Sequence, residues 1–209
     1  MDKKPAKGEY LEVLLRSFKT VFSIKDVVLL WGEEQERRVA VRLNKYAKAG
    51  KLIRLRRGFY AKDENYDRLE LATRIYTPSY ISFETVLTRK GINFQYYETI
   101  FVASYVTRDI EVNKQNISYI RMKNYVLSNI AGVEQNGNVA IATKERAFLD
   151  RIYVSKDYNF DNLDALDWDK VFEILPIYNN KRMDKKVNVY FSAKGGSVSG
   201  RKEYKTYDS

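Results

Sequence analysis

The stretch EQERRVAVRLNKYAKAGKLIRLRRGFYA, residues 34–61, joins a basic amphipathic segment to a basic segment with the pattern of a hairpin. Apolar residues recur at the spacing of one helix face, which predicts a helix over residues 34–49 that Gly50 ends. Residues 51–61 predict two short strands around a turn at Arg57-Gly58. The apolar face of the predicted helix consists of Val39, Ala40, Leu43, Tyr46 and Ala47.

Two more helices are expected before this stretch. Residues 8–18 place Leu11, Leu14, Leu15 and Phe18 on one face, and Ser23 is a suitable N-cap for a short helix that Gly32 ends. Helix, helix, basic helix and basic hairpin is the order of a winged helix-turn-helix. We therefore expect this DNA-binding domain over residues 1–62.

The positive charge of the chain is concentrated in the same segment. Residues 1–62 contain sixteen Lys and Arg against seven Asp and Glu, so they carry +9 of the formal net charge of +10. A segment of this kind favours a polyanionic partner, of which nucleic acid is the commonest. Two alternatives stay open: a basic surface without a partner, and a winged helix that contacts protein.

The basic residues of the predicted helix and hairpin are the candidate double-stranded DNA contacts. We expect Arg37, Arg38 and Arg42 to face the major groove, and Asn44 either to pair with adenine or to be an ordinary exposed polar residue. The hairpin arginines are expected at phosphates or in a minor groove. The full candidate set is Arg37, Arg38, Arg42, Asn44, Lys45, Lys48, Arg54, Arg56 and Arg57.

The rest of the chain predicts a mixed domain, so the expected fold class is α+β. We expect helices around residues 69–75, 83–87, 143–153 and 167–175, with an antiparallel sheet from strands at 97–107, 116–123, 125–134 and 139–143. Asn136-Gly137 predicts a hairpin turn. The expected domains are 1–62, 63–180 and a C-terminal extension, 181–209, that is partly flexible.

The composition excludes several kinds of chemistry. The chain has no Cys and no His, which excludes disulfides, thiolate–zinc sites, Ser-His-Asp triads and histidine acid–base catalysis. We find no apolar run long enough to span a membrane and no signal peptide at the N-terminus. We therefore expect a cytoplasmic protein that is not an enzyme and binds no cofactor or metal.

Three features resemble enzyme motifs, but each has a simpler explanation. Four carboxylates, at Asp161, Asp164, Asp167 and Asp169, lack the glycine of a calcium loop and suit helix capping. The segment 195–202, GGSVSGRK, departs from a P-loop at its last two positions and reads as a flexible tail. Glu145 and Asp150 do not share a helix face, whereas Arg146 and Asp150 have the spacing of an ion pair.

Three segments in this order carry a resemblance to a known family. They are Arg57-Gly58-Phe59-Tyr60 at the hairpin, YISFETVL at residues 80–87 and ATKERAFLD at residues 142–150. Together they make residues 8–178 resemble the AbiEi antitoxins of type IV abortive-infection toxin–antitoxin systems. The tail after about residue 180 matches nothing in that pattern.

The resemblance implies a concrete function. Such antitoxins bind inverted repeats upstream of their own operon through an N-terminal winged helix and repress transcription. Their C-terminal domain counteracts a nucleotidyltransferase-like toxin, without requiring a stable complex, and limits phage spread. The DNA contacts of this family map onto Arg37, Arg38, Arg42, Arg54, Arg56 and Arg57, and no catalytic residue is carried over.

Two other functions remain open. The first is a stand-alone winged-helix regulator from a mobile element, without an adjacent toxin gene. The second is an enzyme targeted by the winged helix, such as a nuclease, which would need an oxygen-ligand metal site that includes Asp164 or Asp167.

Overall fold

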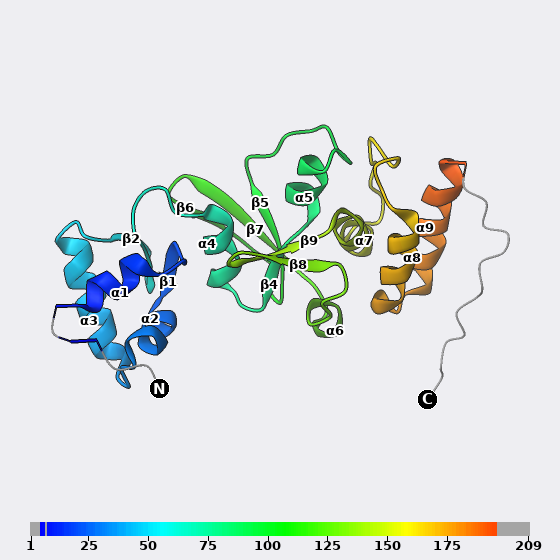
Figure 1. Ribbon diagram of the computed structural model, residues 1–209. Helices are drawn as coiled ribbons and strands as arrows, with labels where there is room; N and C mark the ends of the chain where they lie inside the picture. The colour runs from blue at the N-terminus through cyan, green and yellow to red at the C-terminus, as the bar shows by residue number, and fades with distance from the viewer. Residues whose placement is uncertain (1–4, 7, 196–209) are drawn as a thin grey trace, which may run out of the picture.

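The computed structural model describes residues 5, 6 and 8–195 and shows a mixed α+β protein (Figure 1). The first part of the chain forms three helices and three strands: α1 (Tyr10–Arg16), β1 (Val21–Ser23), α2 (Ile24–Trp31), α3 (Glu36–Lys48), β2 (Ile53–Arg56) and β3 (Phe59–Ala61). These residues form the N-terminal unit. Its three strands are antiparallel, in the order β1-β3-β2.

The predicted elements of the N-terminal unit are confirmed, with differences at their ends. Ser23 caps α2 in a capping box with Asp26, and Gly32 ends that helix at a φ of 57°. The first helix is shorter than expected, because the chain becomes extended at Ser17. Phe18 is therefore not part of a helix face and is 97% exposed, so the prediction that it packs inward was wrong. Strand β1 was not predicted.

The second part of the chain forms a six-stranded sheet with helices around it. Its elements are α4 (Arg68–Ile75), β4 (Ser79–Ile81), α5 (Phe83–Arg89), β5 (Ile100–Ser104), β6 (Arg108–Val112), β7 (Gln115–Arg121), α6 (Asn124–Leu127), β8 (Val133–Asn136), β9 (Val139–Ala142), α7 (Lys144–Val154), α8 (Trp168–Ile174), a 3₁₀ turn η1 (Leu175–Tyr178) and α9 (Lys181–Ala193). The strand order is β6-β7-β5-β4-β9-β8.

The sheet is mixed, so the expected antiparallel sheet was wrong. Strands β5 and β7 pair in parallel, and so do β4 and β9, whereas β6–β7, β4–β5 and β8–β9 are antiparallel. The alternation of side chains along a strand is the same in both arrangements, so it carries no information on direction. Strand β6 lies at the edge of the sheet and pairs with one side of β7, and the other side of β7 pairs with β5.

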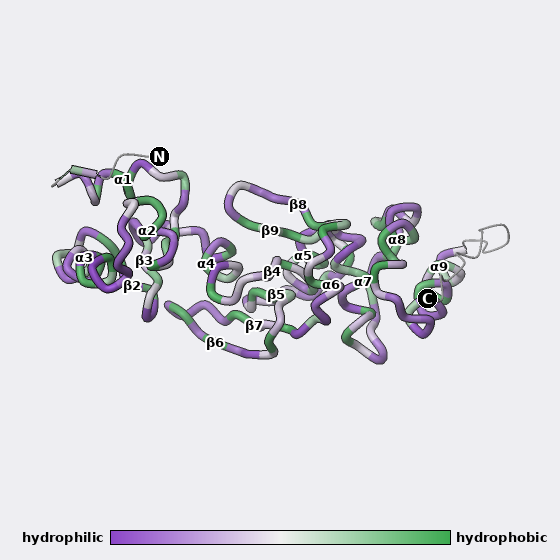
Figure 2. Tube along the Cα trace, turned by 90° about the horizontal axis from the view of Figure 1, so that it is seen from below, coloured by the Kyte–Doolittle hydropathy of each residue, from purple (hydrophilic) through white to green (hydrophobic). Residues whose placement is uncertain are grey.

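Most of the predicted strands and turns are confirmed, and one strand was wrong. The expected hairpin joins β8 to β9, but its two turn residues are Gly137 and Asn138, because Asn136 is the last residue of β8 and pairs with Val139. Residues 125–134 were expected to be a strand, but their first part belongs to α6 and only the end enters β8. Strands β4 and β6 were not predicted. Figure 2 shows the continuous hydrophobic stretches of β5 and β9 within the sheet.

The predicted helices of the second part are confirmed, and a further helix that was not predicted, α9, extends the core. Asp167 caps α8, as expected, and Thr143 caps α7. Ser82 lies at the N-cap of α5, although its hydroxyl donates to Asp150 and not to the helix. Residues 181–193, expected in the extension, form α9, whose Met183 and Val187 are buried in the same core as the sheet.

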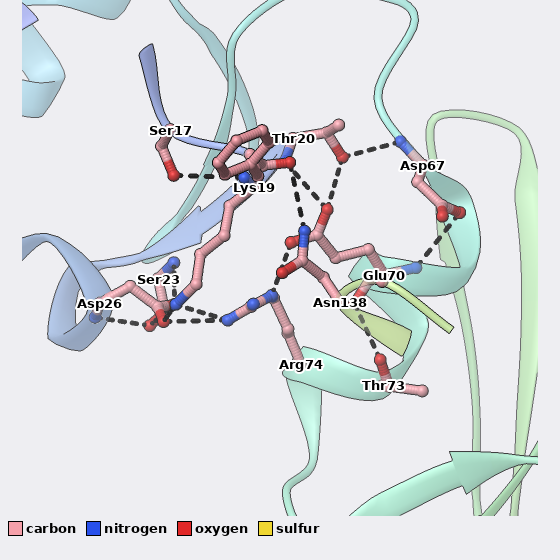
Figure 3. A network of polar contacts seen from close by, with 12 residues as sticks. Ser17, Lys19, Thr20, Ser23, Asp26, Asp67, Glu70, Thr73, Arg74 and Asn138 are labelled. Carbon is pink, nitrogen blue, oxygen red and sulfur yellow. Dashed lines mark hydrogen bonds and ion pairs between the residues drawn. The ribbon is translucent and has the colours of Figure 1, made fainter. Parts of the chain in front are cut away.

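A polar network (Figure 3) joins the N-terminal unit to α4, and a small apolar cluster lies at the same junction. The carboxylate of Asp26 lies 2.6 Å from Lys19 Nζ and 2.9 Å from an Arg74 guanidinium nitrogen. Glu70 accepts hydrogen bonds from the backbone N–H and the hydroxyl of Thr20, at 2.9 and 2.7 Å, and pairs with Arg74 at 3.0 Å. Because both carboxylates have several partners, this network fixes how the unit is oriented on α4.

The charge of Asp26 is strongly favoured in this network. Burial by itself raises the pKa of a carboxyl group, but the hydrogen bonds from Lys19 and Ser23 and the charge of Arg74 lower the pKa of Asp26 to about 2. The contact between the two parts of the chain therefore contributes stability that depends on pH.

Candidate nucleic-acid interface

Helix α3 has one buried face and one exposed cationic face. Val39 and Leu43 are buried in the core of the N-terminal unit, against Trp31 and other apolar residues. The opposite side exposes four of the predicted DNA contacts: Arg37, Arg38, Lys45 and Lys48. Because residues four apart share a helix face, Arg37 and Lys45 lie along one line of that surface.

Val41 lies in the middle of this exposed face and was missing from the predicted set. It is 52% exposed and stands four residues from both Arg37 and Lys45. The spacing could have revealed it, since Val41 falls outside the apolar stripe that contains Val39 and Leu43. An exposed aliphatic side chain on a basic helix can contact a thymine methyl group.

Arg42 lies at the border of the exposed face and holds α1 against α3. Its guanidinium lies 3.5 Å from the centre of the Tyr10 ring and 5.6 Å from that of Trp31. Trp31 Nε1 donates to the carbonyl of Tyr10 at 3.0 Å, so the two aromatic residues are fixed relative to each other. This stacking stabilises the charged side chain where it stands.

Two other predicted contacts on α3 also have partners or partial burial. Arg38 lies 3.9 Å from the carboxylate of Glu33, which precedes the helix and is mostly buried. This long ion pair weakens the positive potential at the start of the helix only slightly, because the Arg38 side chain is 66% exposed. Asn44 is half-buried at the other border of the face.

The hairpin arginines point in different directions. Arg54 and Arg57 are exposed, and Gly58 adopts a φ of 84° that allows the tight turn after Arg57. Arg56 is half-buried and acts on the second part of the chain: burial raises the pKa of Tyr119 in β7, and the charge of Arg56 partly offsets this effect. The structure therefore leaves Arg54 and Arg57 as the exposed cations of the hairpin.

The second part of the chain contains a fully buried polar network. Asp150 accepts hydrogen bonds from Tyr178 Oη and Ser82 Oγ, both at 2.7 Å, from Tyr80 Oη at 3.0 Å, and from Arg146 Nε at 3.2 Å. Both Arg146 and Asp150 have no exposed surface. The expected pair at this spacing is present, but in the core and not on the surface.

The remaining donors of Arg146 are satisfied by the Tyr80 hydroxyl, at 2.9 Å, and by the backbone around α6. The guanidinium donates to the carbonyls of Val126, Asn129 and Ala131, at 2.8, 3.3 and 2.7 Å. Burial disfavours a charged guanidinium, but Asp150, Tyr178 and Tyr80 together outweigh this effect and raise the pKa of Arg146. A closed network of this kind orders the core and offers no open position to a substrate.

The features that resemble enzyme motifs have structural roles. Asp167 caps α8, and Asp161 accepts a hydrogen bond from the backbone N–H of Phe94. Asp164 pairs with Lys194 at 3.2 Å. In the part of the chain that the structure describes, no group of three or more Asp or Glu side chains is placed to hold a metal ion. Segment 195–202 lies outside the described residues after Gly195.

No protein-family model matches this sequence, and none of the curated proteins does so. Among residues 5, 6 and 8–195, no helix is long and apolar enough to cross a membrane.

Proposed function

We propose that the N-terminal unit is a winged helix-turn-helix that binds double-stranded DNA. The order of three helices and a hairpin supports this, and so does the sheet order β1-β3-β2, which pairs the hairpin with the strand that leads into α2. In this proposal α3 enters the major groove, whose width of about 12 Å admits a helix.

The observation that carries the proposal is the exposed face of α3. Arg37, Lys45 and Lys48 supply cations for phosphates and base edges, and Val41 supplies an apolar contact in their midst. The exposed Arg54 and Arg57 of the hairpin extend the positive surface toward the backbone or a minor groove.

We further propose that the protein is the antitoxin and autorepressor of a toxin–antitoxin operon and acts without catalysis in the cytoplasm. The resemblance to the AbiEi antitoxins supports this proposal. Two of its three segments meet in the buried network, where Tyr80 and Ser82 bind Asp150. Since core packing explains these residue types, we place the antitoxin activity on the surface of the second part and not in this network.

The DNA proposal is tested by fluorescence anisotropy with the DNA just upstream of the gene and with scrambled DNA of equal length. We expect specific binding at least about 10³-fold tighter than non-specific binding. The variant Arg37→Gln/Arg38→Gln/Lys45→Gln should lose most of this preference. Its salt dependence should fall by about 0.9 in slope for each phosphate contact removed.

A matched variant controls for net charge. Arg89→Gln/Lys90→Gln/Lys114→Gln removes three exposed charges from the second part of the chain and should leave specific binding unchanged. Equal losses in the two variants, or equal binding of both DNAs by the wild type, would exclude α3 as a recognition helix.

The antitoxin proposal is tested in cells by induction of the neighbouring nucleotidyltransferase-like gene. The α3 variant should lose repression of a reporter but still protect growth, because protection is assigned to the second part of the chain. Repression without any protection, or the lack of a toxin gene beside this one, would favour a stand-alone regulator from a mobile element.

A further inference from the structure

A groove with a volume of about 750 Å³ lies in the second part of the chain, far from α3. It is bounded by the corner between β7 and α6, the end of α7 and the start of α9. Figures 1 and 2 show α6, α7 and α9 on the other side of the sheet from the N-terminal unit. The residues that line it are Arg121, Met122, Lys123, Asn124, Tyr153, Val154 and Asn180.

The lining of this groove is cationic. Arg121 and Lys123 are exposed on either side of the buried Met122, and no carboxylate lines the groove. Neither cation forms an ion pair within the described part of the chain, and the contact of Lys123 is a cation–π approach to Tyr125 at 5.8 Å. Both charges are therefore available to an anion.

Two helix ends lie at the groove, and together they leave the sign of its potential to the two cations. Asn180 caps α9, a helix of 13 residues, so that the positively polarised end of the helix lies at the groove. The end of α7 contributes the opposite partial charge, so the two helix ends offset each other and the two full charges decide the potential. Burial and a hydrogen bond with Tyr125 raise the pKa of Tyr153 from 10.0 to about 12, and at either value its hydroxyl is neutral at pH 7.

We propose that this groove binds a phosphate-bearing ligand of about the size of a mononucleotide. A guanidinium presents paired N–H donors that match phosphate oxygens, and an ammonium adds a point charge. The amides of Asn124 and Asn180 and the Tyr153 hydroxyl provide neutral hydrogen bonds. The volume falls in the range of small-ligand sites, about 300–1,000 Å³. This site does not depend on DNA binding by α3.

The test is calorimetric titration of the full chain with pyrophosphate and, separately, with ATP. The variant Arg121→Gln/Lys123→Gln should weaken binding of both probes by about 100-fold, since it removes two charge-assisted interactions. A second variant, Asn124→Asp, should weaken binding by placing a negative charge in the groove. Because all three residues are exposed, their replacement should leave the melting temperature unchanged.

The control Lys90→Gln/Lys114→Gln removes two exposed charges elsewhere and should bind both probes as the wild type does. Equal affinity for the two probes would assign the site to a phosphate group alone, whereas tighter binding of ATP would assign it to a nucleotide; either supports the proposal. It is overturned if the wild type binds neither probe at about 1 mM, or if the control loses as much affinity as the groove variant.

DNA binding distinguishes this site from the one on α3. The groove variant should bind the upstream DNA as the wild type does, even if the proposed function is correct. A loss of DNA affinity as large as that of the α3 variant would mean that the groove is part of the DNA surface, and would overturn a separate small-ligand site.

Discussion

Replacement of Asp150 by Asn tests whether the second part of the chain is held together by its buried network. The carboxylate has no exposed surface and has four donors around it: Arg146, Tyr80, Ser82 and Tyr178. Asparagine has nearly the same shape but no charge, and its NH₂ group would face other donors. The substitution therefore strands the Arg146 guanidinium in the core without a counter-ion.

The expected loss of stability follows from the burial of the Arg146–Asp150 pair. Removal of one partner of a fully buried pair destabilises a protein by about 3–5 kcal/mol, because the remaining charge has lost both water and its partner. For a chain of this length each kcal/mol lowers the melting temperature by about 2–4 °C, so we expect a decrease of roughly 10 °C. The three backbone carbonyls that Arg146 also contacts limit this loss but do not replace a charge.

The assay is urea unfolding at pH 7 with matched variants. Asp164→Asn makes the same chemical change at an exposed carboxylate paired with Lys194 and should cost no more than about 0.5 kcal/mol. The double variant Arg146→Met/Asp150→Asn should cost less than the sum of its single variants, because the stranded charge is gone. Equal stability of Asp150→Asn and Asp164→Asn would refute this account of the core.

Three further outcomes are expected. Between pH 5 and pH 2 the difference in unfolding free energy between wild type and Asp26→Asn should narrow by about 2 kcal/mol. The folded-state pKa of Asp26, near 2, lies below the ordinary 3.8, so its stabilising effect is lost as the pH falls through that interval. Acid titrations of the unfolding free energy of both proteins would measure this change. Gly132→Ala should destabilise the folded protein by about 2–4 kcal/mol, because a Cβ there would lie 2.7 Å from Ile174 Cδ1 and the φ of 70° disfavours any side chain. Gly137→Ala, where a Cβ would enter open space, should cost only about 1 kcal/mol in the same unfolding assay. If α3 reads DNA, Val41→Ala should weaken specific binding by about tenfold in anisotropy assays without a change in salt dependence, because no charge is removed; an altered salt slope would contradict this role.

Local signals in the sequence predicted many helices and turns correctly. Ser23 and Asp167 cap helices as predicted, and the expected hairpin forms at Gly137. Capping and turn formation depend on a few neighbouring residues, so one sequence contains the necessary information. The failures at residues 125–134 and at Phe18 arose where apolar periodicity was ambiguous and the end of an element depended on packing.

The candidate site was only partly visible in the sequence. The composition located the basic segment, and the helical period separated Val39 and Leu43 from the cationic face. It did not show that Arg42 stacks on Tyr10 or that the charge of Arg56 acts on Tyr119 in β7, because both pairs join residues far apart in the sequence. Val41 was missed for a different reason: the candidates were chosen mainly for their positive charge, and valine carries none.

The sequence by itself determined the α+β class, the basic N-terminal segment and the absence of thiol and imidazole chemistry, since these depend on composition and short-range pattern. Tertiary structure alone decided the mixed direction of the sheet, the burial of Arg146 with Asp150 and the cationic groove at Arg121 and Lys123. Strand direction follows from connectivity, and burial and grooves follow from which distant elements meet. Neither property is encoded in the spacing of neighbouring residues.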